Sequence, residues 1–232
     1  MKLNVMKIIL FSIITLLLMS CGPRHNILGT TYGWSDPNIK VLLDASVDKL
    51  RIRHVRTPSE ECKSGYHDHI EMMGEIGPDS TAAVERLLPQ LERCEKPNGS
   101  GWIVNTAYLS SGGGYLSDGY KLGELFKQYQ IKTIVTGGQS CASSCAIAFL
   151  GGKFRSMHHD AVLLFHAPYI GNGIAIDCSD RGQVKSLEKY YKNMLGAKDG
   201  EFLLDRTLSY CSQSSGWTLN SDGAKLFGIT TD

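Results

Sequence analysis

Short apolar segments alternate with helix-like segments along the chain from residue 69 onward. The strand-like segments are HIEMMGEI, GWIVNTAYL, KTIVTGG and DAVLLFHAP, and each is followed by one or two segments with apolar residues at helical spacing. This alternation predicts an α/β fold with a parallel sheet, because parallel strands are joined by crossovers that usually contain a helix. The earlier segment KVLLDASVDKLRIRHV fits either a strand pair or a helix.

Glycines and a histidine stand where the predicted strands end. Glycine turns occupy residues 112–114 and 137–138, and His166 closes the last predicted strand. In open α/β sheets, ligands bind beyond the carboxyl ends of the strands. We therefore interpret these positions as parts of one site.

The segment CASSC, residues 141–145, contains the residue types of a nucleophile turn. A serine becomes a nucleophile when a base takes its proton and hydrogen-bond donors receive the developing oxyanion. Ser143 stands at the start of a predicted helix, where the N–H of Ser144 lacks an intrahelical acceptor. His166 ends an apolar strand and is the candidate base.

Taken in order, these motifs resemble the Clp-type serine proteases of the crotonase-like superfamily, and most closely their exported bacterial members. The similarity runs from Met72 to Gly228 and rests on GEIGPDSTAAVERLLPQL, LSSGGGYLSDGYKLGELF, CASSCAIAFLGG, AVLLFHAPY and LNSDGAKLFGI. The resemblance implies a repeated ββα superhelix with a parallel sheet. It also implies Ser143 as nucleophile, His166 as general base, and Gly114 with the backbone of Ser144 as oxyanion hole. Ser144 is the alternative nucleophile.

Two positions depart from the family pattern. Gly112 replaces a proline, which loosens the turn, and Gly216 stands where the family has its orienting Asp. Loss of that acid costs on the order of 10⁴ in rate and leaves residual activity. The resemblance therefore implies a Ser-His dyad or an inactive site, and we expect a hydroxyl or carbonyl within 214–216 to orient His166.

Two classes of function follow from this site. The first is an ATP-independent serine hydrolase, a peptidase acting on short or unfolded segments. The second is a non-catalytic protein of the same fold that binds a peptide or protein partner. No cofactor is expected, since the coenzyme A chemistry of related crotonase folds does not suit an exported protein. The substrate and the oligomeric state stay open.

The first 21 residues have the form of a bacterial export signal. Lys2 and Lys7 precede an apolar run from Ile8 to Met19, which is shorter than the roughly 20 apolar residues of a membrane span. Residues 18–21 resemble the lipobox of bacterial lipoproteins, whose cysteine is lipidated, for instance with palmitate. We expect residues 1–20 to be a signal peptide and Cys21 to carry the lipid anchor. An uncleaved anchor helix is the alternative.

Length and charge fit one exported domain. Removing residues 1–20 of the 232 leaves 212, which we divide into a tether and entry segment, 21–60, and an α/β domain, 61–232. The signal carries two lysines and no acid, so 22 basic residues face 23 acidic ones. This balance argues against nucleic acid as a partner. By resemblance to the sorting pattern of Gram-negative lipoproteins, Gly22 favours the periplasmic side of the outer membrane.

Six cysteines follow Cys21, and an even number in an exported chain predicts disulfides. Sequence alone does not select among the fifteen pairings that six cysteines allow. Two pairs that each close a loop of about 30 residues would stabilise the domain by roughly 3–4 kcal/mol each. The preferred pairs are Cys62–Cys94, Cys178–Cys211 and, across the nucleophile turn, Cys141–Cys145.

The remaining clusters of metal-ligating residue types are interpreted as solvated loops. Residues 67–69 read His-Asp-His and residues 158–160 read His-His-Asp, and both clusters flank predicted strands. The Cys-x₃-Cys spacing has no partner pair at zinc-finger distance, so no zinc site is expected there. We therefore expect no metal site.

Overall fold

The computed structural model describes residues 25–27, 30–32, 38–170, 174–175, 177–211 and 215–231. The predicted signal peptide and Cys21 lie outside the described residues, as does position 214. Within the described part of the chain, no helix is long and apolar enough to cross a membrane.

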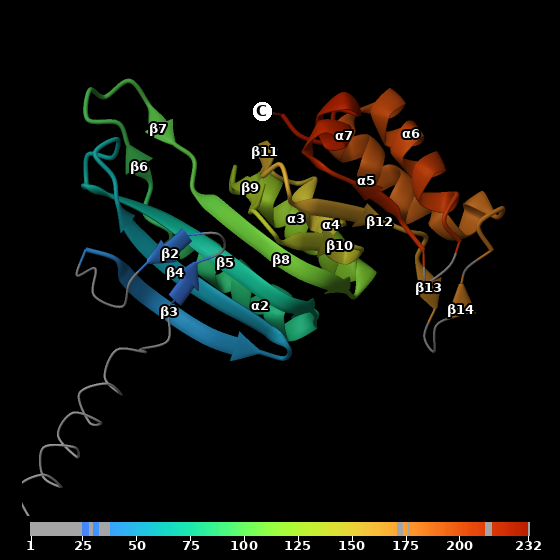
Figure 1. Ribbon diagram of the computed structural model, residues 1–232, viewed down its shortest axis with the longest axis horizontal. Coiled ribbons are helices and arrows are strands. Elements are labelled where there is room, and N and C mark those ends of the chain that lie inside the picture. Colours follow the sequence, from blue (N-terminus) through green and yellow to red (C-terminus); the bar gives the residue numbers. More distant parts are fainter. Residues whose placement is uncertain are drawn as a thin grey trace, which may run out of the picture.

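A mixed sheet of nine strands organises the described residues (Figure 1). The path runs through β15 (Trp217–Leu219), β12 (Val162–Phe165), β10 (Ser140–Ala142), β8 (Thr106–Gly114), β5 (Tyr66–Ile76), β4 (Leu50–Pro58) and β3 (Lys40–Val47). A branch from β8 adds β9 (Lys132–Val135) and β11 (Phe154–Met157). The inner pairs are parallel, and β15, β4 and β3 join antiparallel.

Three two-stranded sheets lie outside this path. They pair β1 (His25–Ile27) with β2 (Thr30–Tyr32), β6 (Cys94–Glu95) with β7 (Trp102–Ile103), and β13 (Tyr169–Ile170) with β14 (Ile174–Ala175). All three are antiparallel.

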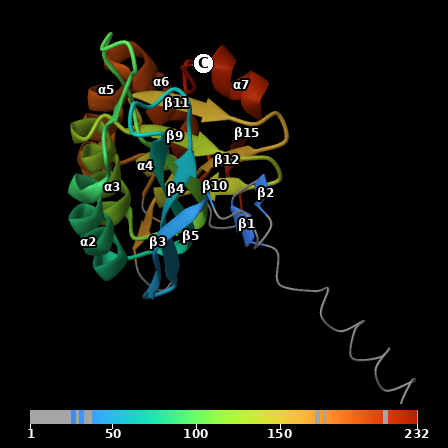
Figure 2. The ribbon, with the colours of Figure 1, turned by 90° about the vertical axis from the view of Figure 1, so that its left-hand side faces the viewer.

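The helices follow the strands in a repeating order. They are α2 (Pro78–Leu87), α3 (Leu116–Gln128), α4 (Ser144–Phe149), α5 (Lys185–Leu195), α6 (Ala197–Leu208) and α7 (Ser221–Leu226), with 3₁₀ turns η1 (Leu88–Gln90) and η2 (Arg181–Val184). Figure 2 shows α2 and α3 beside each other on one face of the sheet. The order strand, strand, helix recurs as β4-β5-α2, β7-β8-α3 and β9-β10-α4, and again as β11-β12-α5 with β13, β14 and η2 inserted before the helix. The predicted α/β fold with a largely parallel central sheet is confirmed.

Several element boundaries differ from the sequence-based expectation. The ambiguous segment before residue 60 is the hairpin β3–β4. The helix expected to run through residue 94 ends at Leu87, because Pro89 lacks an N–H and restricts the residue before it. The strands β10, β11 and β15 were not predicted; each has three or four residues, too few to show a period.

The core lies between the sheet and its helices. It contains Phe126 of α3, Phe149 of α4, Phe165 of β12 and Tyr191 of α5, none more than 1 % exposed. Full burial of such a side chain contributes roughly 1.5–3 kcal/mol. This packing fixes the end of β12 against α4 and α5.

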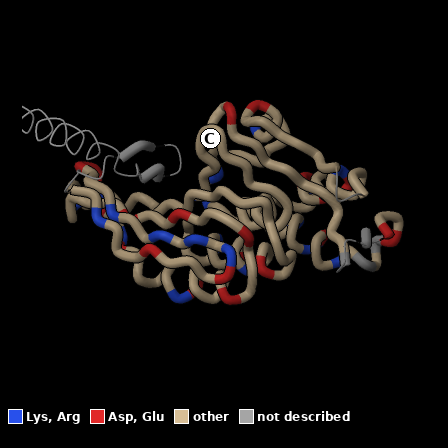
Figure 3. The backbone as a smooth tube through the Cα atoms, turned by 60° about the horizontal axis from the view of Figure 1, so that its bottom comes forward, with Lys and Arg blue, Asp and Glu red and all other residues tan. Residues whose placement is uncertain are grey.

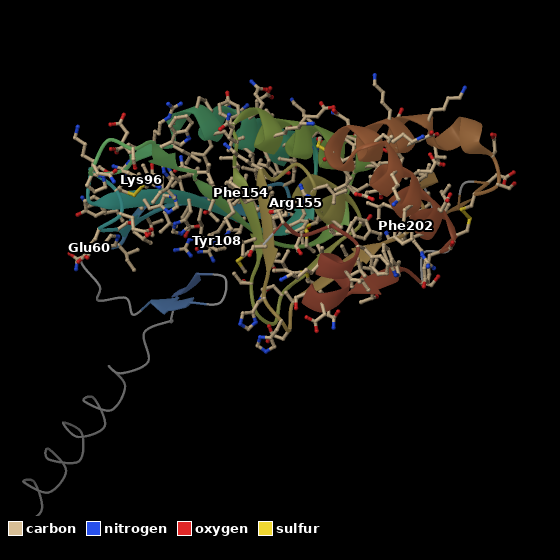
Figure 4. The ribbon with its side chains drawn as sticks, turned by 90° about the horizontal axis from the view of Figure 1, so that it is seen from above. Glu60, Lys96, Tyr108, Phe154, Arg155 and Phe202 are labelled. Atoms are coloured by element: carbon tan, nitrogen blue, oxygen red, sulfur yellow. A yellow bond between two sulfur atoms is a disulfide. The ribbon has the colours of Figure 1, made fainter. Side chains whose placement is uncertain are left out.

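Arg155 of β11 joins the C-terminal segment to the sheet. Its Nε donates to the carbonyl of Ile229 (2.6 Å), and its backbone N–H donates to Oγ1 of Thr231 (2.8 Å). Figure 4 labels Arg155 beside Phe154 in the middle of the molecule, with Phe202 among the C-terminal helices. The chain end is therefore attached to the central sheet.

The three disulfides of the structure are the three preferred pairs. The Cα atoms are 4.9 Å apart in Cys62–Cys94, 5.2 Å apart in Cys141–Cys145 and 6.1 Å apart in Cys178–Cys211. The local pair differs in setting from the expected helical turn, because Cys141 lies on β10 and Cys145 on α4. It therefore bridges a strand-to-helix turn.

Candidate active site

Ser143 occupies a strained turn between β10 and α4. Its backbone has φ +56° and ψ −125°, outside the left-handed region that non-glycine residues enter. Such conformations cost of order 1–3 kcal/mol and cluster at active sites. A strained serine between a strand and a helix is also the geometry that exposes the nucleophile of α/β-hydrolases. Its N–H donates to the carbonyl of Leu164 (2.9 Å), which fixes the turn beside β12.

Two neighbours hold the turn in place. The Cys141–Cys145 disulfide closes it, and both cysteines are buried. Gly113 of β8 packs directly against it, because a Cβ at that position would lie 2.6 Å from Ser143 Cβ and 2.8 Å from the carbonyl oxygen of Ala142. Only glycine fits this contact, and the φ of +104° at Gly113 also favours glycine.

The two adjacent serines face different surroundings. Ser143 is half-buried and lines a cavity. Ser144 is 1 % exposed, and its Oγ has no hydrogen-bond partner among the described residues. A Cβ at Gly119 of α3 would lie 2.9 Å from Ser144 Cβ, so that side chain packs toward α3. The geometry therefore favours Ser143 over Ser144 as the residue that meets a substrate.

His166 follows β12 and lines the same cavity as Ser143. Its Nδ1 lies 2.7 Å from the carbonyl oxygen of Ala167. A carbonyl can only accept, so Nδ1 carries the hydrogen and a neutral ring leaves Nε2 free to take a proton. Tyr169 stacks on the imidazole, with ring centroids 5.1 Å apart and planes 8° apart, which restrains the ring further.

The cavity has a volume of about 420 Å³ and mixed walls. Glycine backbone from the end of β8 faces Ser143 and His166, and apolar side chains come from α3, α4, α5 and β12. The lining residues are Glu75, Gly112, Gly114, Tyr115, Leu116, Ser143, Ile147, Phe165, His166, Pro168, Tyr169, Leu187 and Tyr191. Such walls suit a ligand with an apolar body and one reacting polar group.

Backbone N–H groups of β8 and α4 border the cavity. The N–H of Gly113 donates to Oγ of Ser111 (3.0 Å), and the N–H of Tyr115 donates to the carbonyl of Ile76 (3.1 Å). Gly114 lies between these two residues, at the end of β8, and lines the cavity. The N–H of Ser144, at the first position of α4, lacks an intrahelical acceptor.

Gly216, the position at which we expected an orienting acid to be missing, packs against Leu164 and Phe165. A Cβ at Gly216 would lie 2.5 Å from Cδ2 of Leu164 and 3.1 Å from the carbonyl oxygen of Phe165, so a side chain there would require the Leu164 side chain to move. We expected a group within 214–216 to orient His166; position 214 lies outside the described residues, and the described partner of the ring lies elsewhere. The acceptor on Nδ1 is the carbonyl of Ala167, the next residue along the chain.

Sequence reasoning missed several residues of the cavity. Tyr169 stacks on His166, and Leu187 and Tyr191 of α5 form part of the wall. The apolar spacing of α5 identified it as a packed helix without indicating that it closes the cavity. Glu75 also lines the cavity, where Lys49 donates to its carboxylate (2.9 Å).

Comparison with known proteins gives a fold likeness. No protein-family model matches the chain, and no curated protein matches it in sequence. Among solved structures, the chain is similar to a point mutant of ClpP1 from Listeria monocytogenes, with a TM-score of 0.49 and 17% sequence identity. The similarity covers 69% of this chain and 86% of that one.

Proposed function

We propose that the protein is a serine hydrolase, and more narrowly a peptidase, that works through a dyad of Ser143 and His166. The observation that carries the proposal is the strained Ser143 at a cavity it shares with His166, whose Nδ1 is bonded to a backbone carbonyl. The carbonyl of Ala167 fixes the tautomer that general-base catalysis needs. That is the part an orienting Asp plays in a triad.

The dyad would act in two steps. Oγ of Ser143 attacks the carbonyl carbon of the substrate as its proton moves to Nε2 of His166, and a tetrahedral oxyanion forms. The N–H groups of Gly114 and Ser144 receive the oxyanion. The intermediate collapses as His166 gives the proton to the leaving amine, which departs and leaves an acyl-serine. Water, deprotonated by His166, then releases the acid and restores Ser143.

A backbone carbonyl is a weaker partner for an imidazolium than a carboxylate, because it carries no full charge. We therefore expect a slow enzyme that acts on activated esters and on short or unfolded peptides. The proposal includes export, with a lipid on Cys21 holding the protein at the periplasmic side of the outer membrane. Proteolysis there would be independent of ATP. The apolar cavity walls support a substrate with an apolar side chain beside the reacting carbonyl.

The test is hydrolysis of a p-nitrophenyl ester with an apolar acyl group by the purified, disulfide-intact protein. The wild type should turn over, and S143A and H166A should each lose the activity above background. S144A is the matched control, because the Ser144 side chain packs toward α3, and it should retain most of the activity.

Two outcomes would overturn the proposal. Equal turnover by wild type and S143A would mean that the hydrolysis does not involve this serine. No turnover by a folded wild type, together with saturable peptide binding, would favour the non-catalytic peptide-binding protein.

A further inference from the structure

A short turn between β11 and β12 is fixed at both ends (Figure 1). The N–H of His158 donates to the carbonyl of Val135 at the end of β9 (2.9 Å). The N–H of Ala161 donates to the carbonyl of His158 (3.0 Å), which closes a β-turn. The backbone of residues 158–160 is therefore held in one conformation, while the three side chains are exposed.

The side chains of this turn converge. Nδ1 of His158 is hydrogen-bonded to Oδ1 of Asp160. The rings of His158 and His159 have centroids 4.1 Å apart. One ligand atom from each of the three residues lies within 4.8 Å of the other two, and in the part of the chain that the structure describes no other three His, Cys, Asp or Glu residues do so.

Gly137, in the neighbouring glycine turn, packs against this cluster. A Cβ at Gly137 would lie 2.9 Å from Oδ1 of Asp160 and 3.0 Å from Nδ1 of His158. The absence of a side chain at Gly137 thus lets both groups lie against the backbone. The cluster is supported by a second segment of chain and is more than three free side chains on a loop.

We propose that His158, His159 and Asp160 bind a zinc ion. Imidazole nitrogens and a carboxylate oxygen are zinc ligands at 2.0–2.2 Å, which in a tetrahedral site places ligand atoms about 3.4 Å apart. The ligand atoms now lie within 4.8 Å of one another on exposed side chains, so zinc binding would require them to move closer together. Two imidazoles disfavour magnesium and calcium, which prefer oxygen ligands.

The zinc site is separate from the candidate active site. The turn precedes β12 at Val162, whereas His166 follows the other end of the strand at Phe165. Zinc here would not touch the reacting atoms of the proposed hydrolase. Zinc binding at this turn does not depend on whether the protein is a hydrolase. With three protein ligands, the fourth position is open to water or to a group from another molecule.

The experiment is calorimetric titration of the chelator-treated, disulfide-intact full chain with zinc chloride. The wild type should bind one zinc ion, and the H158A/H159A double variant should bind it at least about a hundredfold more weakly. D160N should bind about tenfold more weakly. H67Q is the matched control, since His67 bonds to the carbonyl of Val104 in a different part of the sheet, and it should bind like the wild type.

Two results would overturn the inference. Binding by H158A/H159A as tight as in the wild type would place the zinc elsewhere in the chain. No heat of binding by the wild type at about 100 µM zinc, with circular dichroism showing a folded protein, would mean that the cluster is only a solvated turn. The substitutions at His158, His159 and Asp160 change exposed side chains, so loss of folding does not obscure either result.

Discussion

Asp68 is the most strongly paired carboxylate of the described sheet. Its buried side chain lies 3.0 Å from Nε2 of His54 and accepts from Nε of Arg56 (2.6 Å) and from the N–H of Glu92 (2.8 Å). Burial alone would raise its pKa, but the hydrogen bonds from His54, Arg56 and Glu92 outweigh burial and hold the pKa well below its usual range. Figure 3 shows basic and acidic residues interleaved along the described backbone.

The depressed pKa of Asp68 predicts an acid-sensitive contribution to stability. Its folded pKa lies below the unfolded value of about 3.9, so the contribution is present above about pH 4 and is lost as the pH falls toward the folded pKa. D68N should lower the free energy of unfolding by roughly 3–5 kcal/mol at neutral pH. The difference from wild type should shrink below about pH 4.

Urea unfolding at neutral pH and at about pH 3 measures this contribution. E85Q is the control, because the Lys121–Glu85 pair is exposed and should contribute about 1 kcal/mol or less. A D68N protein as stable as E85Q at neutral pH would show that the buried network does not stabilise the fold.

The glycines of β8 give a second prediction at the scale of residues. G113A places a methyl group 2.6 Å from Ser143 Cβ, so it should displace the nucleophile turn and reduce ester hydrolysis at least about a hundredfold. G112A is the control for G113A, because a Cβ at Gly112 would meet nothing within 4 Å. Initial rates for the two variants provide the comparison. Equal rates would contradict the role given to the Gly113 contact.

At the scale of elements, the local disulfide ties β10 to α4 around Ser143. The Cys141–Cys145 loop is short, so chain entropy gives it about 2 kcal/mol, against about 4 kcal/mol for the Cys62–Cys94 loop. Because this disulfide lies at Ser143, its removal should reduce activity more than stability. C141A/C145A should lose most ester hydrolysis, whereas C62A/C94A should be less stable but retain its rate.

Thermal unfolding measures the stability of both double variants. Initial rates, taken below their unfolding temperatures, measure their activity, so the two effects are separated. Full activity in C141A/C145A would mean that packing alone, through Gly113 and the Leu164 carbonyl, holds Ser143 in its strained conformation.

Elements with a clear period could be predicted, and short ones could not. The helices α3 and α5 have enough turns to show an apolar face, and β5 and β8 are long strands of 11 and 9 residues. The strand β10 has three residues and is defined by its neighbours β8 and β12, which are distant in sequence. Its place in the sheet is what forces the sharp turn at Ser143.

At the scale of the whole molecule, the sequence predicted the α/β class and the meeting of Ser143 and His166 at one cavity. It predicted these because residues at the ends of parallel strands share one edge of the sheet. It did not predict the carbonyl of Ala167 as the partner of His166, because a main-chain group has no sequence signature. Neither could it predict that Gly216 is packed against Leu164 and Phe165.

Attachment to a membrane is the prediction that concerns the chain as a whole. If Cys21 is the lipidated first residue, the mature protein should begin there and incorporate labelled palmitate. C21A should remain unprocessed or appear in the soluble fraction. Mass spectrometry of the mature N-terminus measures this. A mature chain that begins elsewhere and carries no lipid would rule out the lipoprotein.

Covalent labelling of the disulfide-intact protein with a fluorophosphonate, followed by peptide mapping of the adduct, tests whether Ser143 is the nucleophile of a hydrolase. We expect one adduct on Ser143, formed in wild type and S144A and absent from S143A and H166A. An adduct on Ser144 would contradict the assignment of the nucleophile. A folded wild type that forms no adduct at mildly alkaline pH would contradict the claim that this cavity is the active site of a serine hydrolase.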